Sequence, residues 1–143
     1  MDQTSLARTL TAVMVAGDVM GVDLRDAGNA HRALRYLWGS PDGQAACQHL
    51  AVSVTTVPDP DVGLRVRGLT QALWLAASMR YLKPVDDTSF LAVSDTARDM
   101  TESMLRGLSE NERAAVAAAG QAWAFRSTVR KTLASSLAFP PGT

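Results

Sequence analysis

AVSVTTVPDPDVGLRVRGL, residues 51–69, is the stretch in which helix and strand compete most closely. β-Branched residues are frequent in its first seven positions, and GLRVRGL alternates apolar and basic residues after the turn residues PDPDV. The two pieces can pair as a small hairpin over about residues 51–68, with Arg65 and Arg67 on its exposed face. A helical interpretation competes because residues 44–52 already have helical character and the alternation is short. We expect a helix here and keep the hairpin as the alternative.

The chain before this stretch has helical signals. Apolar residues follow the three-and-four spacing of one helix face over residues 5–20 and again over 23–38. We expect the first helix to end near Gly21 and Asp23 to cap the second.

Further start and stop signals divide the rest of the chain. Ser40 and Pro41 suit the N-cap and first position of a helix, and Ser109 and Glu112 form a capping box. The expected helices run over residues 41–50, from 64 or 69 to 82, from 87 or 88 to 107, and from 109 to about 137. The sequence therefore predicts an all-α fold: a compact bundle of five or six helices in a single domain, residues 1–143.

Composition limits the class of protein. The chain has 143 residues, of which 47% are apolar and 20% charged, which is typical of one soluble domain with its own core. Fourteen basic and fourteen acidic residues cancel. This balance excludes the overall basic surface of a protein that holds nucleic acid along its whole length.

The single cysteine and the apolar stretches bear on location. Cys47 has no second cysteine for a disulfide or a thiolate zinc site, which favours a reducing compartment. The N-terminus lacks the pattern of a secretory signal, and the most apolar stretch, residues 12–22, is shorter than the roughly twenty residues of a spanning helix. We expect a cytoplasmic protein with no membrane partner.

A possible catalytic motif lies in DLRDAGNAH, residues 23–31. Over residues 25–31 this stretch resembles the motif of the HEPN ribonucleases, helical proteins in which two copies of the motif meet across a dimer and cleave RNA. The resemblance implies metal-independent cleavage, with Arg25, Asp26 and His31 as motif residues and with Arg25 and His31 acting on the phosphate and the ribose hydroxyl. On a regular helix Arg25 and His31 lie about 120° apart, so their pairing needs a distortion at Gly28. Without that distortion, His31 is a hydrogen-bonded histidine of the core.

The same expected helix has a basic face. Arg25, Arg32 and Arg35 occupy adjoining positions beside Tyr36, opposite the apolar stripe. Such a face suits a phosphate or an acidic partner, and it is equally typical of a solvated surface. These four residues are the candidate partner-binding residues.

Other common site chemistries lack their patterns. Cys47 and His49 are two residues apart, so on a helix their side chains point about 160° away from each other. GSPDG, residues 39–43, has neither the lysine of a phosphate loop nor the spacing of a dinucleotide motif. We expect no cofactor and no metal.

Three functional hypotheses remain. The first is a non-enzymatic interaction or adaptor module that binds a partner protein, or itself as a homo-oligomer, through apolar helix faces. The second is the HEPN-like ribonuclease, and the third is a local binder of nucleic acid or an acidic partner through the basic helix face. We favour the first, because the chain has no firm catalytic set and no cofactor loop.

Overall fold

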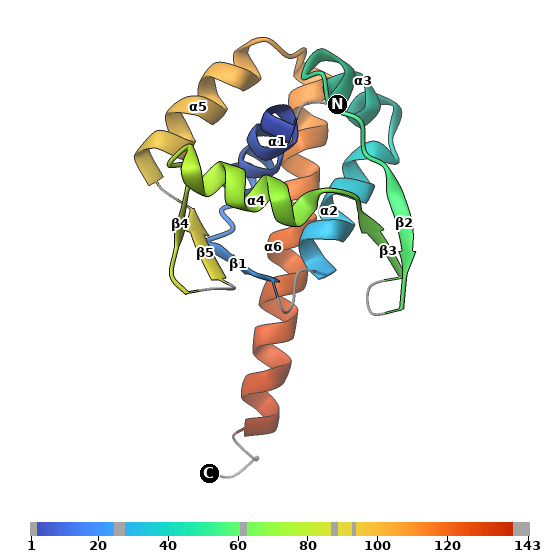
Figure 1. Cartoon of the computed structure of the whole chain (residues 1–143). Helices are drawn as coiled ribbons and strands as arrows, with labels where there is room; N and C mark the ends of the chain where they lie inside the picture. The colour runs from blue at the N-terminus through green and yellow to red at the C-terminus, as the bar shows by residue number, and fades with distance from the viewer. Residues whose placement is uncertain (1–2, 25–27, 61–62, 87–88, 93, 139–143) are drawn as a thin grey trace.

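The computed structural model describes residues 3–24, 28–60, 63–86, 89–92 and 94–138 (Figure 1). The elements in this part of the chain are α1 (Gln3–Ala16), β1 (Gly21–Asp23), α2 (Gly28–Trp38), α3 (Pro41–His49), β2 (Thr56–Asp59), β3 (Gly63–Val66), α4 (Leu69–Ser78), β4 (Leu82–Pro84), β5 (Ser89–Ala92), α5 (Ser94–Arg106) and α6 (Glu110–Ala138).

The all-α expectation is wrong, because the fold contains two small antiparallel sheets beside its helices. One sheet has three strands in the order β1-β5-β4, and the other is the β2–β3 hairpin. The hairpin lies within the stretch kept as the alternative, with Pro58 opposite Leu64. Pro58 has no amide proton to donate and disrupts a helix interior, and Gly63 adopts a φ of 81°, which suits a turn. These local constraints outweigh the helical character of the residues before them.

The three-stranded sheet corrects two further expectations. Asp23 lies in β1 rather than capping α2, and Phe90 and Leu91 lie in β5 rather than in a helix. Positions 87 and 88, the expected start of that helix, are outside the described residues, and α5 begins at Ser94. β1 and β5 are strands because they pair with each other, with Val22 opposite Phe90.

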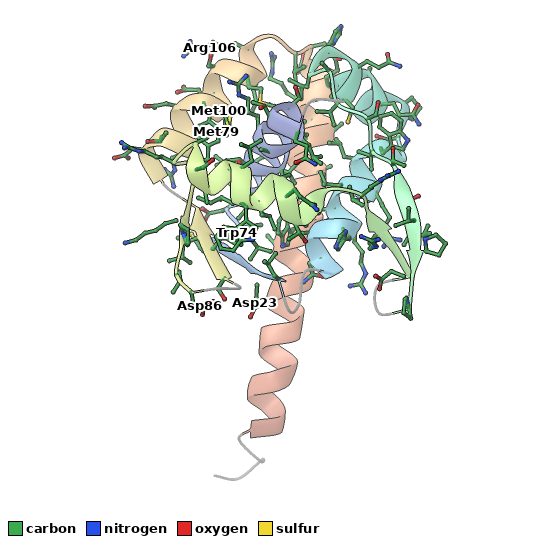
Figure 2. All side chains as sticks on the ribbon, in the orientation of Figure 1. Asp23, Trp74, Met79, Asp86, Met100 and Arg106 are labelled. Atoms are coloured by element: carbon green, nitrogen blue, oxygen red, sulfur yellow. The ribbon has the colours of Figure 1, made fainter. Side chains whose placement is uncertain are left out.

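The inner face of this sheet joins the core. Val22 and Phe90 are buried, whereas Leu91, the next residue along β5, is exposed. Trp74 of α4 packs edge-on against Phe90, with ring centroids 4.7 Å apart (Figure 2). The alternation is that of a sheet with one buried and one solvent-facing side.

Helix α1 lies in the middle of the fold and packs against α4, α5 and α6 (Figure 1). Directly after α1, Gly17 crosses Gly120 of α6 at close range: a Cβ at Gly17 would lie 2.0 Å from the carbonyl oxygen of Gly120. Only glycine at both positions lets the two backbones approach this closely. The C-terminal part of α6 extends beyond the rest of the fold (Figure 1).

Several helix ends are formed by residues other than glycine. α1 ends at Ala16, before the expected Gly21, and its chain reversal uses Asp18 with a φ of 54°. Ala51 after α3 and Arg80 after α4 also have positive φ, 57° and 66°. In each case the next amide donates back to the helix: Val19 to Met14 (2.8 Å), Val52 to Cys47 (2.8 Å) and Tyr81 to Ala76 (2.9 Å). These are Schellman motifs in which a residue other than glycine occupies the left-handed position.

The expected helix starts at Ser40 and Ser109 are confirmed. The Ser40 hydroxyl accepts a hydrogen bond from the Gly43 amide at 3.0 Å. The Ser109 amide donates to the Glu112 carboxylate at 2.8 Å, and the Glu112 amide donates back to the Ser109 hydroxyl at 3.2 Å. This reciprocal pair is the predicted capping box.

Candidate functional site

His31 joins α2 to the outer edge of the hairpin. It lies in the first turn of α2, which begins at Gly28, and its Nδ1 accepts a hydrogen bond from the Val66 amide at 2.8 Å. Val66 is the last residue of β3. The imidazole thus satisfies an amide at the strand edge that β2 does not pair, and it fixes the hairpin against α2.

Charged side chains from both elements surround this contact. Arg35 lies one turn after His31 on α2, and Asp59 of β2 and Arg65 of β3 are also within electrostatic reach of the imidazole. The Arg65 Nε and an Asp59 carboxylate oxygen are 3.7 Å apart, which makes them an ion pair. We call these four residues, His31, Arg35, Asp59 and Arg65, the α2–hairpin site.

The electrostatics of the site keep His31 neutral. Burial lowers the pKa of His31, and the positive charges of Arg35 and Arg65 lower it further, whereas Asp59 raises it. Because Nδ1 accepts from a backbone amide, the neutral ring carries its proton on Nε2. The remaining ring nitrogen is therefore a hydrogen-bond donor.

Arg35 has an unmet hydrogen-bonding group. Its Nε–H is buried and has no hydrogen-bond partner among the described residues. A covered guanidinium interacts more strongly with an added anion than a fully hydrated one does, because less water screens the charge. The arrangement is suited to holding an anionic group beside Arg35 and Arg65.

The other predicted site residues have different positions. Arg25 and Asp26 lie outside the described residues, so the pairing of Arg25 with His31 cannot be followed in the structure. Arg32 donates to the side-chain oxygen of Asn29 at 3.4 Å, and Tyr36 is 56% exposed on α2. Of the predicted residues that the structure describes, His31 bonds to the hairpin, and Arg35 lies within electrostatic reach of His31.

Sequence reasoning missed the hairpin's share of this site. Arg65 was expected on an exposed hairpin face if a hairpin formed, but nothing in its spacing relates it to His31, and Asp59 was not singled out. The alternation of apolar and basic residues in GLRVRGL predicts the strand, but it does not predict that this strand packs against the helix of His31.

Cys47 and His49 do not form a reactive pair. Cys47 is fully buried, and burial raises the pKa of its thiol to about 11, so the thiolate is scarce at neutral pH. His49 instead pairs through Nδ1 with the Glu112 carboxylate at the start of α6. In the described part of the chain, no group of three or more His, Cys, Asp or Glu side chains could hold a metal ion.

Comparison with known proteins adds no relative. No protein family, curated protein or solved structure was found to match the chain. Among the described residues, no helix is both long and apolar enough to cross a bilayer.

Proposed function

We propose that this protein is a non-enzymatic interaction module that binds an acidic segment of a partner protein at the α2–hairpin site. The observation that carries this proposal is the position of Arg65, which the hairpin brings to the same side of α2 as His31 and Arg35. In a chain with no net charge, the site concentrates cations at one place. Arg35, with its covered and unpaired Nε–H, gains the most from an incoming carboxylate.

Asp59 favours an acidic protein segment over a nucleic acid. With His31 neutral, the Asp59 carboxylate leaves the site with a single net positive charge. One or two carboxylates can pair with arginines in bidentate geometry, whereas binding along a nucleic-acid backbone uses many phosphate contacts. The exposed ring of Tyr36, also on α2, adds an amphipathic surface of the kind enriched at protein interfaces.

The exposed apolar side chains support a partner site less directly. Large ones are exposed on different elements and connections: Met20, Tyr36, Leu64, Trp74, Val85 and Leu91. These exposed side chains belong to several elements and loops, from Met20 before β1 to Leu91 in β5, and not to one helix face. We therefore base the proposal on the charged site. We also propose a reducing compartment, since the single Cys47 is buried.

The test is the binding of a fluorescein-labelled oligoglutamate peptide, followed by fluorescence anisotropy at low and moderate salt. Arg35→Gln should weaken binding roughly ten-fold, which corresponds to about 1.4 kcal/mol, because the Arg35 Nε is covered. Arg65→Gln should weaken binding less, because the Arg65 side chain is 50% exposed and water screens its charge. Arg106→Gln is the matched control, because Arg106 lies at the end of α5, on the side of the fold away from the hairpin (Figure 2).

Two outcomes contradict the proposal. One is equal binding of the peptide by the Arg35, Arg65 and Arg106 variants. The other is preference for a labelled single-stranded oligonucleotide of the same charge, with a steep loss of affinity as salt rises, which would assign the site to nucleic acid instead.

A further inference from the structure

A second candidate site lies directly after β3, at the residues that follow Val66. A cavity of about 250 Å³ opens there between the start of α1 and the connection from β3 to α4. Five residues line it: Gln3, Leu6, Thr55, Arg67 and Gly68. None of these residues belongs to the α2–hairpin site.

Backbone contacts fix the walls of this cavity. The Arg67 amide donates to the Thr55 carbonyl at 2.8 Å, which holds the two strand ends together beyond β2 and β3. Gly68 has a φ of 82°, and a Cβ added there would lie 3.2 Å from the Gln3 side-chain nitrogen and 3.9 Å from a Leu6 methyl. Glycine at this position therefore keeps one wall of the cavity free of a side chain and allows the left-handed backbone.

The polar side chains of the cavity are all able to donate hydrogen bonds. Among the described lining residues they are the Arg67 guanidinium, the Thr55 hydroxyl and the Gln3 amide, and none of these described residues is a carboxylate. Within the described part of the chain, no hydrogen bond or ion pair engages the side chains of these three residues. Leu6, which is buried, supplies an apolar wall.

We propose that this cavity binds the phosphate group of an organic phosphate monoester. Arg67, Thr55 and Gln3 together offer several N–H and O–H donors to one cavity. A phosphate monoester has three terminal oxygens and up to two negative charges, so it can accept more of these hydrogen bonds than a carboxylate with two oxygens and one charge. Arg67 supplies the charge and the multiple N–H groups that phosphate recognition uses. A cavity of about 250 Å³ is larger than a phosphate, and the remaining space beside Leu6 accommodates the carbon atoms of the ester. The inference does not rest on the proposed function, because the two sites use different arginines.

The experiment is an NMR titration of the ¹⁵N-labelled full chain with O-phosphoserine, inorganic phosphate and acetate in parallel. We expect O-phosphoserine to shift the amide signals of Thr55, Arg67 and Gly68, with inorganic phosphate weaker and acetate weakest. Arg67→Gln should reduce the affinity for O-phosphoserine roughly ten-fold and Thr55→Val several-fold, whereas Arg65→Gln, two residues earlier and within β3, should bind normally.

Other outcomes overturn the inference. Shifts of equal size with acetate remove the preference for phosphate, and unchanged affinity in Arg67→Gln means an adventitious ion only. Saturating O-phosphoserine that leaves these three amides unmoved rules the site out. Gly68→Ala adds a methyl group to the wall and should weaken binding, and the dispersion of its amide spectrum shows whether the fold is retained. Arg65→Gln also separates the two proposals, because it should impair peptide binding and leave phosphate binding intact.

Discussion

His31 and His49 each make one contact through Nδ1, but the two imidazoles have opposite requirements. His31 lies between α2 and the hairpin and accepts a hydrogen bond from the Val66 amide, so its Nδ1 carries no proton. His49, at the end of α3, has a side chain that is 63% exposed and pairs with the carboxylate of Glu112, so its Nδ1 carries a proton. The partner, rather than the residue type, determines which protonation state stabilises each junction.

The largest difference between the two junctions should appear when each imidazole is removed. His31→Leu leaves the amide of the buried Val66 without an acceptor, which should cost about 1–3 kcal/mol of the free energy of unfolding. His49→Leu removes a contact from a largely exposed imidazole to Glu112, whose carboxylate still accepts a hydrogen bond from the Ser109 amide, so this variant should cost less. Urea unfolding followed by circular dichroism measures both.

His31→Asn is the matched variant for this comparison, because its side-chain oxygen can occupy the acceptor position of Nδ1. It should recover part of the stability that His31→Leu loses. Equal losses in the His31→Leu and His49→Leu proteins would contradict the distinction between the two junctions.

Acid should weaken the His31 junction first. Because burial and the neighbouring arginines lower the pKa of His31 below its usual value of 6.5, the unfolded chain takes up this proton before the folded chain does. The stability contributed by neutral His31 is therefore complete above pH 6.5 and decreases as the pH falls from 6.5 towards the lowered pKa. Unfolding curves between pH 7.5 and 5 should show this loss, and His31→Asn should reduce it. A pH slope that is the same with and without His31 would argue against the assignment.

The smallest change in stability is expected at the contact between His49 and Glu112. The Ser109 amide and hydroxyl, together with His49, lower the pKa of Glu112 below its usual 4.5. The stabilisation from ionised Glu112 is therefore present above pH 4.5 and is lost as the pH falls through the lowered pKa. Glu112→Gln removes this ionisation but retains a capping-box side chain, so it should be milder than Glu112→Ala. Thermal melts at pH 7 and pH 4 test this order, which fails if the two variants melt alike at pH 7.

The helix starts could be predicted because their signals are local. Ser40 with Pro41, and Ser109 with Glu112, satisfy amides within three residues of themselves. The helix ends were harder, because Asp18, Ala51 and Arg80 adopt the left-handed conformation that glycine normally occupies, which Asp adopts occasionally and Ala and Arg rarely. Packing beyond each helix imposes that conformation, so the glycine signal on which sequence reasoning relies was absent.

Short strands had the weakest sequence signal. β1 has three residues and β5 has four, too few for a pattern, and each is a strand because the other lies beside it. The β2–β3 hairpin had a recognisable pattern, but the same residues were also compatible with a continued helix. In the structure, Pro58 and Gly63 favour the hairpin over that helix.

The candidate site also has one part on a predicted helix and one part that depends on tertiary packing. His31 and Arg35 are one turn apart on α2, although the sequence pattern placed Arg35 on a basic face opposite the apolar stripe and His31 either in the core or in a motif with Arg25. Asp59 and Arg65 reach them only because the hairpin packs along α2, a contact over about thirty residues of chain that no local pattern encodes.

The sequence by itself determined the starts of α3 and α6, the absence of net charge and the basic residues available for a site, because these depend on neighbouring residues and on totals. The tertiary structure alone decided the three-stranded sheet, the non-glycine helix ends and the neutral state of His31. Each of these depends on a partner far away in the chain, whose approach sets the pairing, the backbone conformation and the local field.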